Sequence, residues 1–100
     1  MAKRRFSPTR KLNKRNIEKT PDKKPALYKI KNRKGDNVYT GVAQRGRVQE
    51  RLQEHMPGGP DPIPGADSFS VKQKPSIGGA KGEEKRIIKD EQPKHNEQSR

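Results

Sequence analysis

Two short runs near the start of the second quarter alternate apolar and polar side chains and favour β-strands. ALYKIK and VYTGVA are rich in β-branched and aromatic residues, and NRKGDN lies between them. Within that linker, Gly35-Asp36 supplies the residues that a tight turn requires. The pattern therefore predicts a hairpin of residues 27–31 and 37–42.

The alternation also assigns faces to the predicted strands. Successive side chains of a strand point to opposite sides of the sheet. Tyr28 and Ile30 thus share one face of the first strand, and Tyr39 and Gly41 share one face of the second.

GRVQERLQEHM has the apolar spacing of a helix and predicts one over residues 46–56. Val48, Leu52 and Met56 recur at every fourth position, so they are expected to pack against the sheet. Arg47, Arg51 and His55 form a parallel stripe beside them. PGGPDPIPG (57–65) follows and is expected to be a loop, because proline and glycine end the helix.

The remaining elements are a strand and a terminal helix. DSFSVKQK predicts a third strand with Phe69 and Val71 on one side, and PSIGGAKG (75–82) is expected to be a second loop. GEEKRIIKDEQ then predicts a helix that ends before Pro93, since the residue before proline disfavours the helical conformation.

This last helix has an unusual apolar side. With about 100° between successive residues, Ile87 and Ile88 define its apolar direction, and Glu84 lies within roughly 10–15° of the centre. Glu83 lies about 90° away. The pattern thus points a carboxylate at the side of the helix that should face the sheet, although an outward ion pair of Glu84 with Lys81 or Lys85 is the alternative.

Composition and charge limit the size of the fold. The chain has 100 residues, of which 24% are hydrophobic and 37% charged, so it can bury only a thin core. We expect an α+β domain over residues 26–96, with a small three-stranded antiparallel sheet flanked by helices. Residues 1–25 are expected to form a disordered basic arm, and residues 97–100 a disordered tail.

The charge is the strongest indication of a partner. The net charge is +13, and residues 1–25 alone contain ten basic and two acidic residues, a net +8. Such a chain is expected to bind a polyanion: DNA, with RNA as the alternative. In the arm, Lys3, Arg4 and Arg5 are expected to bind phosphates, although a solvated tail without a role fits the same pattern.

Other features exclude several classes of protein. Cysteine is absent, which rules out disulfides, thiolate catalysis and cysteine-ligated zinc. No apolar run approaches the ~18–20 residues of a membrane span, and no hydrophobic signal segment follows the basic start. We expect a cytoplasmic protein without membrane contact, the alternative being an organellar presequence.

Four pieces of the sequence, in order, resemble the GIY-YIG nuclease superfamily. They are ALY followed by VYTG, the helix ERLQEH, the segment EKRIIKDEQPKHN and, within it, the P-x-x-N spacing. The family includes intron-homing endonucleases and the nuclease module of the bacterial excision-repair incision enzyme. The likeness covers about residues 26–96. The chain departs from the pattern at Ala26 and Thr40, where the family has glycine and isoleucine.

The resemblance implies roles for particular residues and a metal-dependent cleavage of DNA phosphodiesters. Mg²⁺ or Mn²⁺ would be held by a single glutamate, since Mg²⁺ binds through one or two carboxylates together with phosphate and water. An arginine would bind the phosphate, and a tyrosine would align or deprotonate the attacking water. The implied catalytic residues are Tyr28, Tyr39, Arg51, His55 and Glu84, with Glu84 as the metal ligand. The implied binding and bracing residues are Gly41 and Asn96. Arg47, in the stripe with Arg51, is also expected to bind the substrate.

Each assignment has a structural alternative, and the function has rivals. The tyrosines could be packing residues, Arg51 could simply pair with Glu50 or Glu54, and Glu91 shares the helical angle of Glu84. The rival functions are a non-catalytic nucleic-acid-binding module on the same fold and an unrelated RNA- or ribosome-associated protein. No sequence-reading module is recognisable, so a dimer mate or partner protein would supply targeting.

Overall fold

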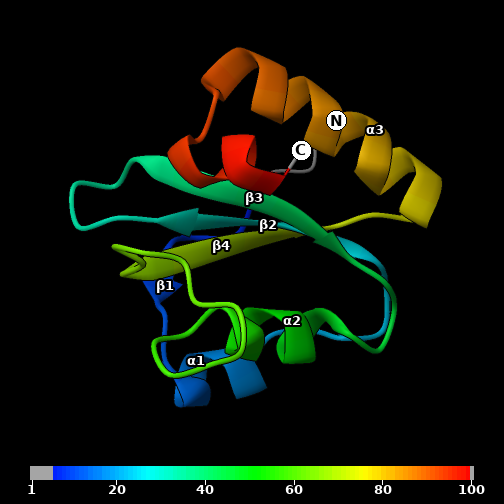
Figure 1. The fold of residues 1–100 in the computed structure, drawn as a ribbon. Helices are drawn as coiled ribbons and strands as arrows, with labels where there is room; N and C mark the ends of the chain where they lie inside the picture. Colours follow the sequence, from blue (N-terminus) through cyan, green and yellow to red (C-terminus); the bar gives the residue numbers. More distant parts are fainter. Residues whose placement is uncertain (1–5, 100) are drawn as a thin grey trace.

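The computed structural model describes residues 6–99 and forms one α+β unit (Figure 1). A four-stranded antiparallel sheet with the strand order β1-β4-β2-β3 lies between two layers of helices. The strands are β1 (Arg10–Lys11), β2 (Ala26–Lys31), β3 (Asn37–Ala43) and β4 (Ser68–Gln73). The helices are α1 (Lys14–Glu18), α2 (Val48–Glu54), α3 (Ile77–Glu91) and the 3₁₀ helix η1 (Lys94–Ser99).

The predicted hairpin is present, with β2 and β3 paired in the register that places Tyr28 opposite Gly41 and Ile30 opposite Tyr39. The register shifts between Ile30 and Lys31, next to the turn. On its other edge, β2 pairs with β4, so that Tyr28 also lies opposite Val71. Tyr28 is therefore in the central strand of the three longest ones.

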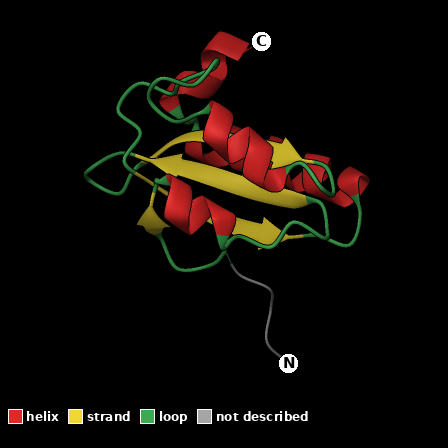
Figure 2. Cartoon of the chain, turned by 90° about the horizontal axis from the view of Figure 1, so that it is seen from below, coloured by secondary structure: helices red, strands yellow, loops and turns green. Residues whose placement is uncertain are grey.

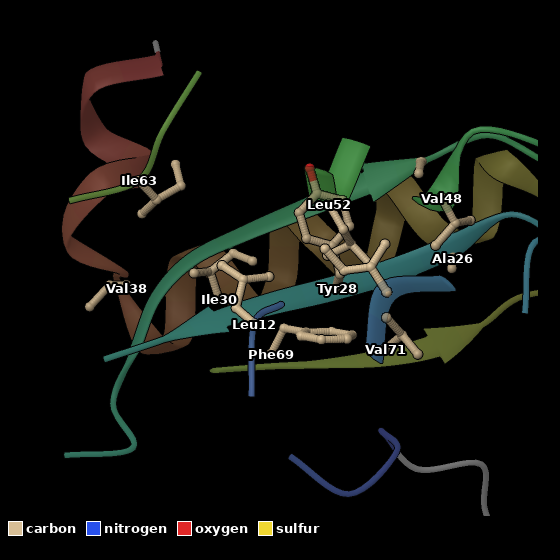
Figure 3. Packing of buried hydrophobic residues seen from close by; sticks show 12 residues of the cluster. Leu12, Ala26, Tyr28, Ile30, Val38, Val48, Leu52, Ile63, Phe69 and Val71 are labelled. Carbon is tan, nitrogen blue, oxygen red and sulfur yellow. The ribbon is translucent and has the colours of Figure 1, made fainter. Parts of the chain in front are cut away.

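One face of the sheet carries the hydrophobic core, and α1 and α2 cover it (Figure 2, viewed from their side). Val48 and Leu52 of α2 have no exposed surface, which agrees with the predicted apolar stripe. They pack against side chains of the sheet that share one face, as Figure 3 shows. These sheet residues are Ala26, Tyr28 and Ile30 of β2, and Phe69 and Val71 of β4.

The opposite face is covered by α3 and η1. Leu27 and Ala80 are fully buried there, and ion pairs join the sheet to α3. Lys29 of β2 binds Glu91 at 3.1 Å, and Lys72 of β4 binds Glu83 at 2.8 Å. Lys74, just beyond β4, binds Glu83 at 2.7 Å. Because lysine side chains from the sheet meet carboxylates from α3, this layer needs fewer apolar residues than the layer under α2.

The prediction of three strands and a disordered arm is wrong for the described part of residues 1–25. Arg10 and Lys11 add a fourth strand to β4, and Asn13 caps α1 by accepting a hydrogen bond from the backbone N–H of Asn16. Ile17 is completely buried in the core. The arm folds because this isoleucine supplies apolar area that the thin core otherwise lacks.

The expected loop of residues 75–82 is also wrong for most of its length, because α3 begins at Ile77. Ser76 caps the helix by accepting a hydrogen bond from Gly79 N–H at 3.1 Å, and Ala80 is fully buried. Residues 97–99, predicted as part of a disordered tail, continue η1. No helix in the described residues is long and apolar enough to cross a membrane.

Candidate active site

The predicted catalytic tyrosine of β2 is hydrogen-bonded to the predicted histidine of α2. The hydroxyl of Tyr28 lies 2.8 Å from Nε2 of His55, and both side chains are completely buried. Nδ1 of His55 lies 2.9 Å from the backbone carbonyl of Asp61. A carbonyl oxygen only accepts, so Nδ1 carries the proton and donates it. In the neutral ring, Nε2 then accepts the hydrogen bond of the Tyr28 hydroxyl.

The Pro/Gly loop that follows α2 is what fixes His55. Asp61 N–H bonds the carbonyl of Glu54 at 3.0 Å, and Ile63 N–H bonds the carbonyl of His55 at 3.2 Å. Ile63 itself is buried in the core. The loop is thus anchored by backbone hydrogen bonds to the end of α2 and by the burial of Ile63. The carbonyl of Asp61 in this loop sets the tautomer of His55.

Three rings from three elements meet at this point. The ring centroid of Tyr39 lies 4.9 Å from that of His55 and 6.2 Å from that of Tyr28. The centroids of Tyr28 and His55 are 5.5 Å apart. Tyr39 is only partly buried, so it forms the exposed side of the cluster.

Gly41 makes room for this cluster. A Cβ atom at this position would lie 2.5 Å from Cζ of the Tyr28 ring and closer still to its hydroxyl oxygen. The resemblance implies that Gly41 takes part in binding, but the close neighbour of its would-be Cβ is Tyr28 itself. The glycine is needed because the phenol lies directly over the edge strand.

Arg51 adds a positive charge beside the phenols. Burial alone would lower the pKa of its guanidinium, but Tyr28 and the carboxylate of Glu54 outweigh that effect and raise it. Nη1 of Arg51 binds Glu54 at 3.2 Å, which is the ion pair that the sequence left open. Since the side chain of Arg51 is 38% exposed, its remaining donors are accessible to an anion.

A basic hollow of about 220 Å³ lies next to this arginine. It is lined by the end of β3, the residue that follows it and one side of α2: Val42, Ala43, Gln44, Arg47 and Arg51. Arg47 is exposed and pairs with Glu50 at 2.9 Å. Because two guanidinium groups one helical turn apart line the same hollow, an anion there would meet both.

Burial raises the pKa of the Tyr28 phenol far above its ordinary value, and the nearby Tyr39 adds to the rise. Arg51 acts in the opposite direction but does not offset the burial. Burial also raises the pKa of Tyr39, again against the effect of Arg51. Arg51 alone, therefore, does not turn Tyr28 into the ready base that the sequence-based mechanism calls for, and a further cation or a proton acceptor is required.

Glu84 comes from α3, which packs against the other face of the sheet and contacts the edge strand β3. Its carboxylate is nevertheless close enough to raise the pKa of both Tyr28 and Tyr39. The pKa of Glu84 is itself raised by burial, with a partial offset from Lys81. Among the residues that the structure describes, none forms a hydrogen bond or an ion pair with this carboxylate.

The neighbouring acids of α3 behave differently. The pKa of Glu83 is lowered, because hydrogen bonds and charge from Lys72 and Lys74 outweigh its burial. Glu91, at a similar helical angle to Glu84, also has a lowered pKa, because its bonds to Asn37 and Lys29 outweigh its burial. Glu91 is thus engaged in a structural ion pair, and Glu84 is the acid of this helix whose charge acts on both phenols.

Asn96 lies at the same edge of the sheet. Its side-chain oxygen accepts a hydrogen bond from Thr40 N–H at 2.7 Å, and its amide donates to the Thr40 carbonyl at 2.9 Å. The amide thereby satisfies backbone groups of the edge strand β3 between Tyr39 and Gly41. Within the described part of the chain, the Asn96 side chain forms hydrogen bonds with Thr40 alone, so its role here is to hold the strand that carries Tyr39 and Gly41.

The remaining expectations concern the arm and the metal. Lys3, Arg4 and Arg5 lie outside the described residues. Within residues 6–99, no three histidine or acidic side chains come together as a ready-made metal site. A single carboxylate with free oxygens fits Mg²⁺ that takes its other ligands from water and a phosphate, so Glu84 fits the expected ion.

Two contributors to the site were missed by the sequence. The carbonyl of Asp61 carries no sequence signal, since every residue has one. Asp22 orients the start of α2: its carboxylate accepts from Val48 N–H at 2.7 Å, although Arg47 occupies the cap position. A signal for Asp22 did exist, because aspartate is a preferred capping residue, but it lies far from α2 in sequence.

The comparisons with known proteins add no relative. A scan against protein-family models, a search of curated proteins and a search of solved structures each find no match to this chain.

Proposed function

We propose that this chain is a GIY-YIG-type nuclease domain that hydrolyses DNA phosphodiesters with Mg²⁺ or Mn²⁺ in the cytoplasm. The observation that carries the proposal is the cluster of Tyr28, His55 and Tyr39, with the charges of Arg51 and Glu84 acting on the same phenols. An unrelated basic protein gives no reason for the three rings to meet, or for these two charges to act on the same phenols.

In the proposed reaction, Arg51 binds the non-bridging oxygens of the scissile phosphate. Its free donors and its partial exposure suit this role, and Arg47 holds an adjacent phosphate in the same hollow. A preorganised donor aimed at developing negative charge is typically worth about 3 kcal/mol of transition-state stabilisation.

The proton path starts at Tyr28. Its hydroxyl donates to Nε2 of His55, so the ring can take the phenol proton while its own Nδ1–H stays on the carbonyl of Asp61. For the phenolate oxygen then to accept a proton from the attacking water, the buried hydroxyl has to become accessible when DNA binds. Burial makes this phenolate costly, and the positive charge of Arg51 partly compensates.

The metal would be bound by Glu84. A divalent ion held at this carboxylate would supply positive charge for the phosphate and the leaving oxygen. The raised pKa of Glu84 means that burial disfavours the charged carboxylate, a cost that a bound cation removes. The affinity for the ion is therefore expected to be low without DNA.

The proposal is tested by incubating the protein with duplex, nicked and branched DNA in the presence of Mg²⁺ or Mn²⁺. Wild-type protein is expected to cleave at least one of these, and Arg51→Ala to lose about 10²-fold or more of the rate. Arg33→Ala, an exposed arginine in the β2–β3 turn, is the matched control and should keep the wild-type rate. If none of the substrates is cut, the chain is not a nuclease.

A second candidate is a binding module that keeps the fold without the chemistry. It is favoured by the complete burial of the Tyr28 hydroxyl, which is already engaged by His55. A salt-dependent gel shift that survives the double substitution Arg51→Ala and Glu84→Gln, with no cleavage by the wild type, would select this alternative.

A further inference from the structure

The feature that leads beyond the proposed chemistry is the way in which the basic N-terminal segment docks onto the start of α2. Asp22 uses its backbone carbonyl to accept from Gly46 N–H at 2.8 Å and its carboxylate to accept from Val48 N–H at 2.7 Å. Gln49 of α2 donates to the carbonyl of Thr20 at 2.8 Å. Residues 18–24 are therefore fixed against the first turn of α2.

This docking gathers positive charge at one end of the sheet. Lys23 and Lys24 follow Asp22 directly, and Arg45 and Arg47 flank Gly46, to which Asp22 is bonded. All of these basic side chains are exposed. We name this group the cationic rim; it consists of Lys23, Lys24, Arg45 and Arg47.

The nearby acids do little to neutralise the rim. The carboxylate of Asp22 is used in capping α2, and Glu50 is paired with Arg47. Glu18 is exposed and forms no ion pair with a described residue. Apart from Arg47, the rim residues form no ion pair within the described chain either, so they are available to a polyanion.

The rim is continuous with the basic hollow. Arg47 belongs to both, and the hollow extends from it to Arg51, one helical turn further along α2. We propose that the cationic rim is the track for the duplex DNA backbone that leads into the hollow, so that the folded N-terminal segment positions the substrate beside Arg51. This inference rests on the proposed function only in taking DNA as the ligand.

The physical basis is the release of counterions. Duplex DNA carries about one negative charge per 1.7 Å of its axis, and each phosphate neutralised by a fixed cation steepens the salt dependence of binding by about 0.9 in log K against log salt. A rim that is held in place by backbone hydrogen bonds should contribute to this slope more than equally charged residues elsewhere on the surface.

The test compares two double substitutions that remove the same charge. Lys23→Gln with Lys24→Gln alters the rim, whereas Arg33→Gln with Lys34→Gln alters the β2–β3 turn. That turn joins the opposite ends of the strands, because Lys31 pairs with Asn37 there and Ala26 pairs with Ala43 at the rim end. Both are made in full-length protein that carries Glu84→Gln, and binding to a short duplex is measured without metal between about 50 and 200 mM salt.

The rim variant is expected to flatten the slope by about 1–2 and to weaken binding at low salt by about tenfold or more, while the control keeps the slope of its parent. Equal losses in both variants, or no loss in the rim variant, would overturn the proposal. Because the assay requires neither metal nor cleavage, a failed nuclease proposal would leave its outcome readable, and a failed rim would leave the cleavage test untouched.

Discussion

The face of the sheet under α1 and α2 is closed by apolar side chains, whereas the face under α3 combines a few buried apolar residues with ion pairs between lysines and glutamates. The residues of the candidate site differ from the other side chains on the same face of the sheet. Tyr28 and His55 bring polar atoms into the apolar layer under α2. Glu84 lies in the layer under α3, where the other glutamates form ion pairs, but it has no hydrogen-bond or ion-pair partner among the described residues.

These exceptions show where the fold buries polar groups at a cost in stability. A buried hydroxyl and imidazole are tolerated because they bond each other and a backbone carbonyl. A half-buried carboxylate with a raised pKa has no such compensation within the described residues. Local departures of this kind are expected at functional sites, where positioning for a ligand outweighs stability.

The largest effect on stability is expected from Gly41→Ala, which tests how tightly the apolar face is packed at the edge strand. The new methyl group would collide with the buried ring of Tyr28, at a cost of about 3 kcal/mol. Gly82→Ala in α3 is the control: no atom lies within 4 Å of its would-be Cβ, so it should gain about 0.5–1 kcal/mol. Urea denaturation measures both, and a neutral Gly41→Ala would contradict the packing.

Asn96→Ala should have the next largest effect on stability. It tests how η1, on the α3 side of the sheet, holds the edge strand β3. The substitution leaves Thr40 N–H and C=O without their side-chain partners, which should cost about 2 kcal/mol. Lys94→Ala, an exposed residue of the same 3₁₀ helix, should change stability by less than about 0.5 kcal/mol. Hydrogen exchange of the Thr40 amide provides a local measure, and unchanged protection would argue against the brace.

Tyr28→Phe is expected to have a smaller effect, of about 1–2 kcal/mol, because it leaves Nε2 of a fully buried histidine without its donor. Tyr39→Phe removes a hydroxyl from a partly exposed ring and should be nearly neutral. Denaturation of the two variants side by side measures the difference. Equal changes in the free energy of unfolding would mean that the Tyr28–His55 hydrogen bond adds no stability to the apolar layer.

The smallest effects, below about 1 kcal/mol, concern the acids of α3 and depend on pH. The lowered pKa of Glu83 means that its contribution to stability is present above its unfolded pKa of about 4.3 and is lost as the pH falls through the folded-state value. Glu83→Gln should thus destabilise the protein at pH 7 but not in acid.

The raised pKa of Glu84 has the opposite effect on stability. Its charged form opposes folding at pH values above the folded-state pKa, and this penalty disappears as the pH falls through that value. Glu84→Gln should therefore stabilise the protein slightly at pH 7. Denaturation at neutral and acid pH would measure both variants, and a destabilised Glu84→Gln at pH 7 would show that this carboxylate has a structural partner.

Local patterns predicted much of the fold. The hairpin, the strand β4 and the helix α2 differ from their predicted bounds by at most two residues, because alternation, turn residues and helical spacing are local signals. The strand β1 was missed because it is two residues long and exists only through pairing with β4, far along the chain. The start of α3 was hidden by three glycines, although Ser76 could have signalled its cap.

The candidate site was predictable only through residue types and their order. Nothing local indicates that His55 lies 2.8 Å from Tyr28, because the two are 27 positions apart and meet through the packing of α2 on the sheet. The same holds for the Asp61 carbonyl, which is placed by the loop and not by its side chain. The helical angle relative to Ile87 and Ile88 predicted that Glu84, and not Glu83, faces the sheet. Glu83 also reaches the sheet, where it pairs with Lys72 and Lys74.

The central claim is that Glu84, whose charge acts on the phenols, serves the proposed chemistry, while Glu83 serves only the fold. Single-turnover cleavage of DNA with Mg²⁺ or Mn²⁺ by Glu83→Gln and Glu84→Gln tests it most directly, since the two variants differ by one position and by no charge. The account predicts a loss of about 10²-fold or more for Glu84→Gln and a change of no more than a few-fold for Glu83→Gln. Equal rates in the two variants would contradict it.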